Sequence, residues 1–97
     1  MRHILVTYDV CTEESAGQRR LRRVAKICES YGQRVQKSVF ECLIDDTTFE
    51  KFEHKLLSAI DRDADSLRIY WIARPFEQNV RQYGEGRSID FSGPLVL

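Results

Sequence analysis

The chain has 97 residues, which is enough for one small domain, and nothing in its composition indicates a second. Its 42% hydrophobic and 31% charged residues are typical of an ordinary globule and exclude a disordered chain. Fifteen basic and fifteen acidic side chains give zero formal net charge, which argues against a general polyanion binder but leaves the arrangement of the charges open. Because so short a chain buries only about two-thirds of its unfolded surface, association between copies is a common way to complete its core.

The three cysteines, Cys11, Cys28 and Cys42, are odd in number and form no CxxC pair. We therefore expect reduced thiols rather than a disulfide framework or a zinc site. No long apolar run follows Met1, so we expect neither a signal peptide nor a membrane span, and we place the protein in the cytoplasm.

The first half of the chain predicts a strand, a turn and a helix. Residues 3–9 form a β-branched and aromatic run that predicts a central strand. Residues 10–17 are polar and turn-like, and a helix is predicted from about Gln18 to Ser30. Gly32 suits the left-handed position just past the end of that helix.

The second half of the chain predicts two strands, a helix and a further strand. Two strands are predicted over 34–36 and 38–44, and Thr47 with Glu50 has the spacing of a capping box at the start of a second helix. Residues 66–72 predict a further strand. The second helix presents one apolar stripe at helical intervals, made of Phe49, Phe52, Leu56 and Ile60.

This order predicts an α+β fold of the ferredoxin-like βαββαβ type, with a four-stranded antiparallel sheet and two helices on one face. The whole chain, 1–97, is then one ferredoxin-like domain. An apolar ending, Leu95-Val96-Leu97, follows Gly93-Pro94 and is not needed by that motif. We expect segment 88–97 to form an extra C-terminal strand that docks on a partner subunit, with packing on its own sheet edge as the alternative.

The first helix carries a basic face opposite its apolar stripe. At roughly 100° per residue, Leu21, Val24, Ala25 and Cys28 fall on one side. A solvated helix face is the ordinary interpretation of such charges. Clustering of one sign in a neutral protein also indicates a surface that contacts phosphate backbones. The face is formed by Arg19, Arg22, Arg23 and Lys26, with Arg20 on its flank.

Asp9 directly follows the first apolar strand. A carboxylate in this place often caps the next turn. A strand end on a rigid sheet can also hold a metal ligand or a general base accurately. Because Mg²⁺ prefers several oxygen ligands, one Asp per chain makes a metal site mainly if a two-fold axis brings in a second copy.

The other candidate catalytic or metal-binding residues have weaker support. Glu13 and Glu14 lie in the following loop, and we expect Glu41 to form an ion pair with a basic residue. His3 and His54 are isolated, and Cys11 has no nearby histidine to activate it as a nucleophile. The GxSxG, P-loop and GxGxxG motifs are absent from the sequence, so serine hydrolase, NTPase and dinucleotide-binding functions have no support.

Four segments together resemble the CRISPR-associated protein 2 family, in order and over nearly the whole chain. The segment Tyr-Gly-x-Arg-Val-Gln-x-Ser-Val-Phe-Glu at 31–41 is highly specific, and the Ser-Ile-Asp and Pro-Leu ending looks like the type I-C branch. Trp71 stands where family members often have a basic residue. The four segments are 6–10, 19–26, 31–42 and 65–70.

The resemblance implies a homodimer completed by exchange of the C-terminal strand, and a role in CRISPR spacer acquisition, where the dimer bridges subunits of the CRISPR integrase. It also implies a Mg²⁺-dependent (or Mn²⁺-dependent) endonuclease acting on double-stranded DNA or RNA. Asp9 matches the metal-binding aspartate of the family, and Tyr8 matches the catalytic-site tyrosine that precedes it. Arg34, inside the specific segment, joins the predicted nucleic-acid contacts.

Two functions follow. As an antiviral defence enzyme, a dimer would hold Mg²⁺ between two Asp9 carboxylates and hydrolyse a phosphodiester bond. As a non-catalytic scaffold, its basic faces would hold a duplex for the integrase. Other ferredoxin-like domains bind RNA or small molecules, but the strand 37–42 lacks the glycines of an RNA-recognition motif; a toxin-like ribonuclease is the nearest other possibility.

Overall fold

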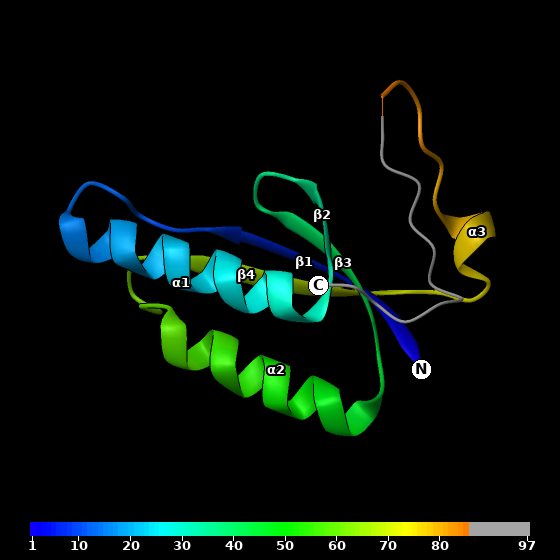
Figure 1. The fold of residues 1–97 in the computed structure, drawn as a ribbon, viewed down its shortest axis with the longest axis horizontal. Coiled ribbons are helices and arrows are strands. Elements are labelled where there is room, and N and C mark those ends of the chain that lie inside the picture. The colour runs from blue at the N-terminus through cyan, green and yellow to red at the C-terminus, as the bar shows by residue number, and fades with distance from the viewer. Residues whose placement is uncertain (86–97) are drawn as a thin grey trace.

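One antiparallel sheet organises the molecule. The computed structural model describes residues 1–85, and in these residues four strands pair in the order β2-β3-β1-β4 (Figure 1). Every pairing in this sheet is antiparallel, with β1 hydrogen-bonded to β3 on one side and to β4 on the other. This is the ferredoxin-like topology, so the predicted fold class is confirmed. The strands are β1 (Arg2–Asp9), β2 (Gln33–Gln36), β3 (Val39–Ile44) and β4 (Ser66–Ile72).

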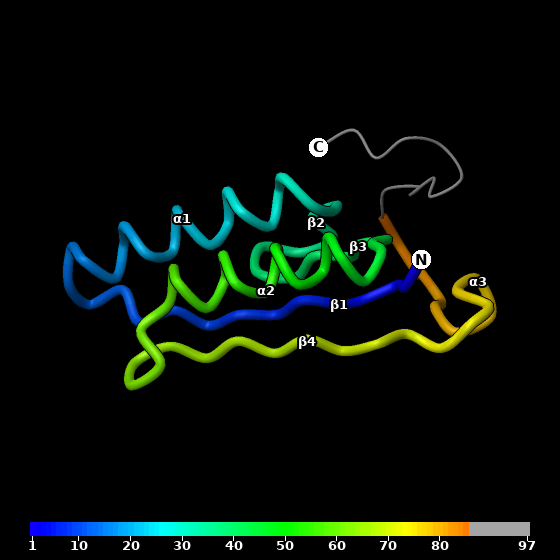
Figure 2. The backbone as a smooth tube through the Cα atoms, turned by 90° about the horizontal axis from the view of Figure 1, so that it is seen from below, coloured from blue at the N-terminus to red at the C-terminus, as the bar shows by residue number. Residues whose placement is uncertain are grey.

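Helices α1 (Ser15–Tyr31) and α2 (Asp46–Ala59) lie on the same side of the sheet (Figure 2). Each forms because its apolar residues recur at helical intervals and face the sheet. Val24 and Cys28 of α1 are buried, as are Phe52 and Leu56 of α2, so both predicted apolar stripes are confirmed. A short helix that the sequence analysis did not predict, α3 (Phe76–Asn79), follows β4.

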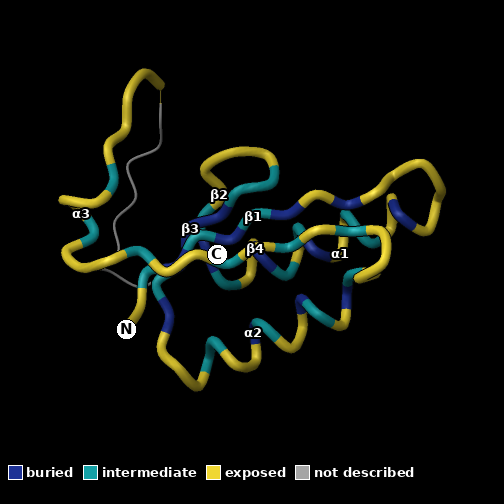
Figure 3. The backbone as a smooth tube through the Cα atoms, turned by 180° about the vertical axis from the view of Figure 1, so that it is seen from behind, coloured by how far each residue is buried: buried dark blue, intermediate teal, exposed yellow. Residues whose placement is uncertain are grey.

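The two faces of the sheet differ in burial. Ile4, Val6 and Tyr8 alternate along β1 toward the helices and are almost completely buried. Phe40 and Cys42 of β3 do the same. Among residues 1–85, no helix lies over the opposite face, and no residue of β4 is buried (Figure 3). The core of the described residues therefore lies between the sheet and the two helices.

The predicted start of the first helix and the predicted capping box of the second helix were wrong. Helix α1 begins at Ser15 rather than near Gln18. A Cβ atom on Gly17 would lie 1.8 Å from the carbonyl oxygen of Cys11, so this glycine permits close packing of the first helical turn rather than marking a turn. Helix α2 is capped by Asp45, whose side chain accepts a hydrogen bond from the Thr48 amide at 2.7 Å, and not by a Thr47–Glu50 capping box.

The left-handed conformation predicted for Gly32 was also wrong. Its φ of −156° is extended backbone that any residue adopts. The glycine is needed for space, because a Cβ atom there would lie 2.4 Å from Cys42 Sγ and 2.6 Å from the Glu41 carbonyl oxygen. Gly32 thus lets the chain turn directly from α1 into β2 against the adjacent strand.

Some predictions concern residues beyond this description. The extra strand and its docking on a partner, predicted for 88–97, lie outside the described residues. Within residues 1–85, no helix combines the length and the apolar character needed to cross a membrane.

Candidate active site and nucleic-acid surface

Asp9 is the last residue of β1, opposite Ser66 of β4, and its side chain is exposed. Because side chains alternate along a strand, Asp9 lies on the helix-free face, together with Leu5 and Thr7. Within residues 1–85, its carboxylate forms neither a hydrogen bond nor an ion pair. The capping role considered for Asp9 is therefore absent from this part of the chain, and the carboxylate is available to a ligand.

The capping role falls to Asp65 instead. The Cys11 amide donates a hydrogen bond to Asp65 Oδ1 at 3.0 Å, and the Asp61 amide donates to Asp65 Oδ2 at 2.8 Å. Arg20 donates to both oxygens, at 2.8 Å from Nε and 3.1 Å from Nη2. These donors satisfy a carboxylate whose side chain is fully buried, and they lower the pKa of Asp65 to about 2, with the Arg20 hydrogen bond as the main cause.

Asp65 and Gly17 together fix the loop that follows Asp9. Asp65 holds the amide of Cys11, and the bare Cα of Gly17 packs against the carbonyl of the same residue. The backbone two residues beyond Asp9 is thereby anchored to both β4 and α1. A strand end held in this way presents its carboxylate in a defined position, as metal binding requires.

Tyr8 lies on the other face of the sheet from Asp9. It is 6% exposed, stacks on Phe40 at 6.2 Å between ring centroids, and its hydroxyl donates a 3.4 Å hydrogen bond to the Lys37 carbonyl. Burial raises the pKa of the phenol, although the nearby Arg34 guanidinium opposes the shift. The structure therefore does not bring the Tyr8 hydroxyl and the Asp9 carboxylate together, because consecutive strand residues point in opposite directions.

The basic face of α1 is exposed as the sequence indicated. Within residues 1–85, its four cations form no ion pair, so their charges are available to phosphates. Arg20, on the flank, differs because its guanidinium is already bound to Asp65. The four free cations are Arg19, Arg22, Arg23 and Lys26.

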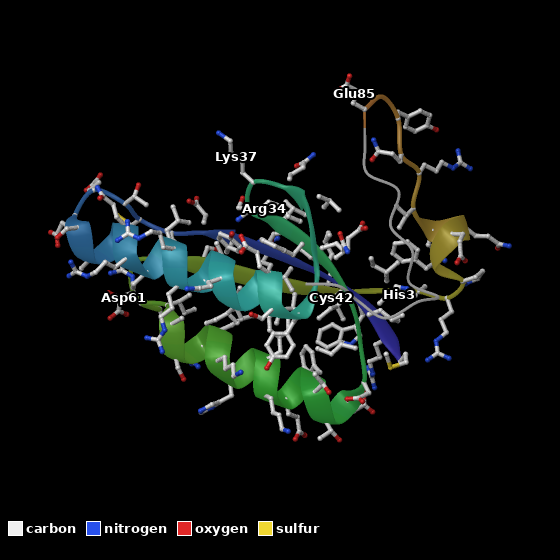
Figure 4. All side chains as sticks on the ribbon, in the orientation of Figure 1. His3, Arg34, Lys37, Cys42, Asp61 and Glu85 are labelled. Carbon is white, nitrogen blue, oxygen red and sulfur yellow. The ribbon has the colours of Figure 1, made fainter. Side chains whose placement is uncertain are left out.

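Arg34 projects from β2 beside the β2–β3 turn that carries Lys37 (Figure 4). Its guanidinium lies 5.0 Å from the centroid of the Phe40 ring and 3.4 Å from the carboxylate of Glu29. It is exposed, so it could contact a phosphate, and its ion pair with Glu29 places it on the same side of the sheet as α1.

Glu41 does not form the expected ion pair, since among residues 1–85 no cation lies within ion-pairing distance of it. It is 9% exposed on the helix-free face of β3, and burial raises its pKa. The cysteines are free thiols, as predicted, and burial raises the pKa of Cys28 and of Cys42 to about 12, which makes both unreactive.

A metal site is incomplete within one copy. Among residues 1–85, no three His, Cys, Asp or Glu side chains come together as a metal-binding group. Mg²⁺ is commonly held by one or two carboxylates, several waters and the phosphates of the substrate. Asp9 can supply one such carboxylate, and its donor chemistry fits Mg²⁺ or Mn²⁺ as half of a site.

The described part of the chain is thus a ferredoxin-like α+β protein with an available carboxylate at a strand end and a separate basic helix face. The model of the family described as CRISPR associated protein Cas2 matches residues 1–80, and the chain belongs to this family.

Relatives and solved structures agree. The "CRISPR-associated endoribonuclease Cas2 1" of Moorella thermoacetica is 53% identical over 98% of this chain and 99% of that protein. The "CRISPR-associated endonuclease Cas2" of Halalkalibacterium halodurans is 47% identical over 97% and 98%, respectively. The crystal structure of Streptococcus pyogenes Cas2 has a TM-score of 0.74 and 48% identity, covering 84% of this chain and 99% of that one.

The sequence did not reveal the parts that fix the Asp9 loop. Asp65 was noted only as the first residue of segment 65–70, and Gly17 only as the last residue of the turn-like segment 10–17. The one available signal was Asp65 at the entry to a predicted strand, but its partners at positions 11 and 20 can be recognised only in three dimensions.

Proposed function

We propose that the protein is a Mg²⁺-dependent endonuclease of the CRISPR system that hydrolyses phosphodiester bonds in double-stranded DNA or RNA as a homodimer. The observation that carries this proposal is the Asp9 carboxylate, exposed and unpaired among the described residues at the end of an anchored strand. The names of relatives as an endoribonuclease and an endonuclease support the same reaction.

The homodimer is argued from the helix-free face of the sheet. Leu5, Leu43 and Ile72 lie there half-buried, and Tyr70 is 44% exposed, so residues 1–85 of one copy leave an apolar surface uncovered. Asp9 lies on the same face. A second copy packed against this face would cover the apolar residues and bring a second Asp9 toward the first.

Each residue then has a part in the reaction. A bound Mg²⁺ would supply activation of water and stabilisation of the charge that develops on the phosphate. The two Asp9 carboxylates would hold the metal, and Asp65 and Gly17 keep the loop that follows each Asp9 in place. Arg19 and Arg22 position the phosphate backbone without reading its sequence. Tyr8 serves as an anchor of β1 in the core.

The test is the substitution Asp9→Asn, which keeps the shape of the side chain and removes its charge. Cleavage of labelled duplex DNA and of RNA in Mg²⁺ should fall by about a hundredfold or more, while duplex binding and dimer mass persist. Glu13→Gln and Glu14→Gln, in the adjacent loop, are the matched controls and should cleave normally. Undiminished cleavage by purified Asp9→Asn protein would show that Asp9 is not the metal ligand.

A second candidate function is a spacer-acquisition scaffold that holds a duplex and bridges two dimers of the CRISPR integrase subunit. It is favoured by the separation of the basic face of α1 from Asp9 and by the unpaired state of its cations within the described residues. Under this function, Asp9→Asn leaves spacer acquisition in cells intact, whereas Arg19→Glu combined with Arg22→Glu abolishes it. The two functions are compatible with each other.

A further inference from the structure

A groove on the outside of the helix layer joins α1 to α2. It is a hollow of about 230 Å³ that lies over the C-terminal half of α1 and the middle of α2. Its lining is Arg23, Lys26, Ile27, Ser30 and Tyr31 from α1 and Lys55 from α2. Since both helices lie on the same side of the sheet, this groove and the helix-free face that carries Asp9 are on opposite sides of the molecule (Figure 2).

The charge of the groove is entirely positive. Three of its six lining residues are cations and none is an acid. Arg23, Lys26 and Lys55 are all exposed, and among residues 1–85 none of them forms an ion pair. Ile27 and Tyr31 add an apolar part to the lining, so the cations stand around a partly desolvated surface. An anion placed there would meet three positive charges and no repulsion from the lining.

Lys55 is held in place by an aromatic stack. Its ammonium lies 5.2 Å from the centroid of the Tyr31 ring, while Phe52 stacks with the same tyrosine at 4.7 Å. The cation–π contact directs this lysine from α2 across the groove toward α1. The Lys55 side chain is therefore already partly ordered before a phosphate binds, which lowers the entropy cost of binding. The Ser30 hydroxyl already donates to the Lys26 carbonyl at 3.0 Å, which leaves the three cations as the main donors to a ligand.

We propose that this groove, the interhelical groove, binds phosphates of a nucleic-acid backbone through Arg23, Lys26 and Lys55, with Lys55 as a contact contributed by the second helix. The inference rests on the proposed nucleic-acid function and extends it, because α2 carries no basic run in the sequence that would indicate a contact. Since Asp9 faces the other way, the phosphates held in the groove are not the ones that lie at the Asp9 carboxylate of the same copy. The groove is a holding site.

The experiment compares Lys55→Glu with Lys51→Glu, the same charge change one helical turn earlier on α2 and outside the groove lining. Binding of a fluorescein-labelled DNA duplex is followed by anisotropy over a range of salt concentrations. Lys55→Glu should weaken binding by about tenfold and reduce the slope of log affinity against log salt by about one. Lys51→Glu should weaken binding by less than about threefold. Arg23→Glu should weaken duplex binding as much as Lys55→Glu does. Because both side chains are exposed, the unfolding temperature of each variant should remain close to that of the parent protein.

Three outcomes would overturn parts of the argument, and they are distinguishable. Equal losses for Lys55→Glu and Lys51→Glu would mean that only net charge matters, and the interhelical groove would be rejected while nucleic-acid binding stands. If micromolar ATP displaces the duplex from the parent protein but not from Lys55→Glu, the groove binds the phosphates of a free nucleotide instead. If the parent protein binds neither duplex DNA nor RNA, the proposed function itself fails.

Discussion

Arg20 and Asp65 form a two-pronged ion pair, with Nε and Nη2 of the guanidinium at 2.8 and 3.1 Å from the two carboxylate oxygens. Asp65 is fully buried at its side chain and Arg20 is 24% exposed. The pair joins the middle of α1 to the entry of β4, next to the strand end that carries Asp9. A residue expected from the sequence to contact nucleic acid thus acts in the folded chain as the support of a neighbouring site.

The first prediction concerns Asp65→Asn. It should lower the free energy of unfolding by about 2–3 kcal/mol at neutral pH, because a buried guanidinium contact loses its counter-charge. The native pKa of about 2 lies below the unfolded value of about 3.9, so the carboxylate stabilises the protein fully above the unfolded value. The difference between the parent and the variant should therefore shrink as the pH falls from about 4 to 2. Urea unfolding at several pH values measures it.

Asp63→Asn, an identical change on an exposed residue of the same loop, is the control and should alter stability by less than about 0.5 kcal/mol. A parent–variant difference for Asp65 that stays constant down to pH 2 would mean that its charge is not what stabilises the fold.

The second prediction concerns Gly17→Ala. Helix propensity alone favours alanine over glycine by about 1 kcal/mol. The new Cβ atom, however, would lie 1.8 Å from the Cys11 carbonyl oxygen, so either the helix or the loop after Asp9 must move. We expect a net loss of about 2 kcal/mol in unfolding free energy and a fall in Mg²⁺-dependent cleavage. Thermal unfolding and a cleavage assay measure the two effects.

Gly84→Ala is the comparison for this change. Nothing lies within 4 Å of its Cβ position, so only its φ of +76° opposes alanine, at a cost of about 1 kcal/mol. It should leave cleavage unchanged. If Gly17→Ala were instead stabilising, close packing of the loop against α1 would be refuted.

The sequence was sufficient for the order of the elements because hydrophobic periodicity is a local property. The strands around Val6 and Phe40 and the helix that buries Phe52 and Leu56 repeat their apolar residues at spacings that a short window reveals. Helix ends were less predictable, since several residues near Asp45 can cap a helix and only one of them has the required backbone conformation.

The candidate site was predictable only in part. Asp9 could be chosen because it ends an apolar run, and the cations of α1 because they share a helix face. The contact between Cys11 and Asp65 spans 54 positions, and no periodicity connects such residues. Lys55 was missed for the same reason, because it joins Arg23 and Lys26 only after two helices pack together.

The third prediction concerns Glu41→Gln. Burial raises the pKa of Glu41, so its ionised form is disfavoured in the native state and the parent protein loses stability as the pH rises through that raised value. Glutamine does not titrate. The variant should be more stable than the parent at pH 7, and the advantage should vanish below about pH 4, where the carboxyl is protonated in both the native and the unfolded protein. Chemical unfolding at pH 4 and pH 7 measures it; an advantage equal at both would exclude ionisation as the cause.

The fourth prediction concerns Tyr8→Phe and separates anchoring from catalysis. The phenol lies on the opposite face of the sheet from Asp9, and its raised pKa keeps it neutral at physiological pH. Its 3.4 Å hydrogen bond to the Lys37 carbonyl is long, and its other hydrogen-bond partner, Arg34, is exposed, so loss of the hydroxyl should cost about 1 kcal/mol. Cleavage in Mg²⁺ should stay within about threefold of the parent, because the hydroxyl points away from the face that carries Asp9. Tyr8→Ala, by contrast, leaves a cavity beside Phe40 and should cost about 3–5 kcal/mol. Folded Tyr8→Phe protein that had lost cleavage a hundredfold would restore the phenol to the chemistry, and would require β1 to rearrange before the bond is cut.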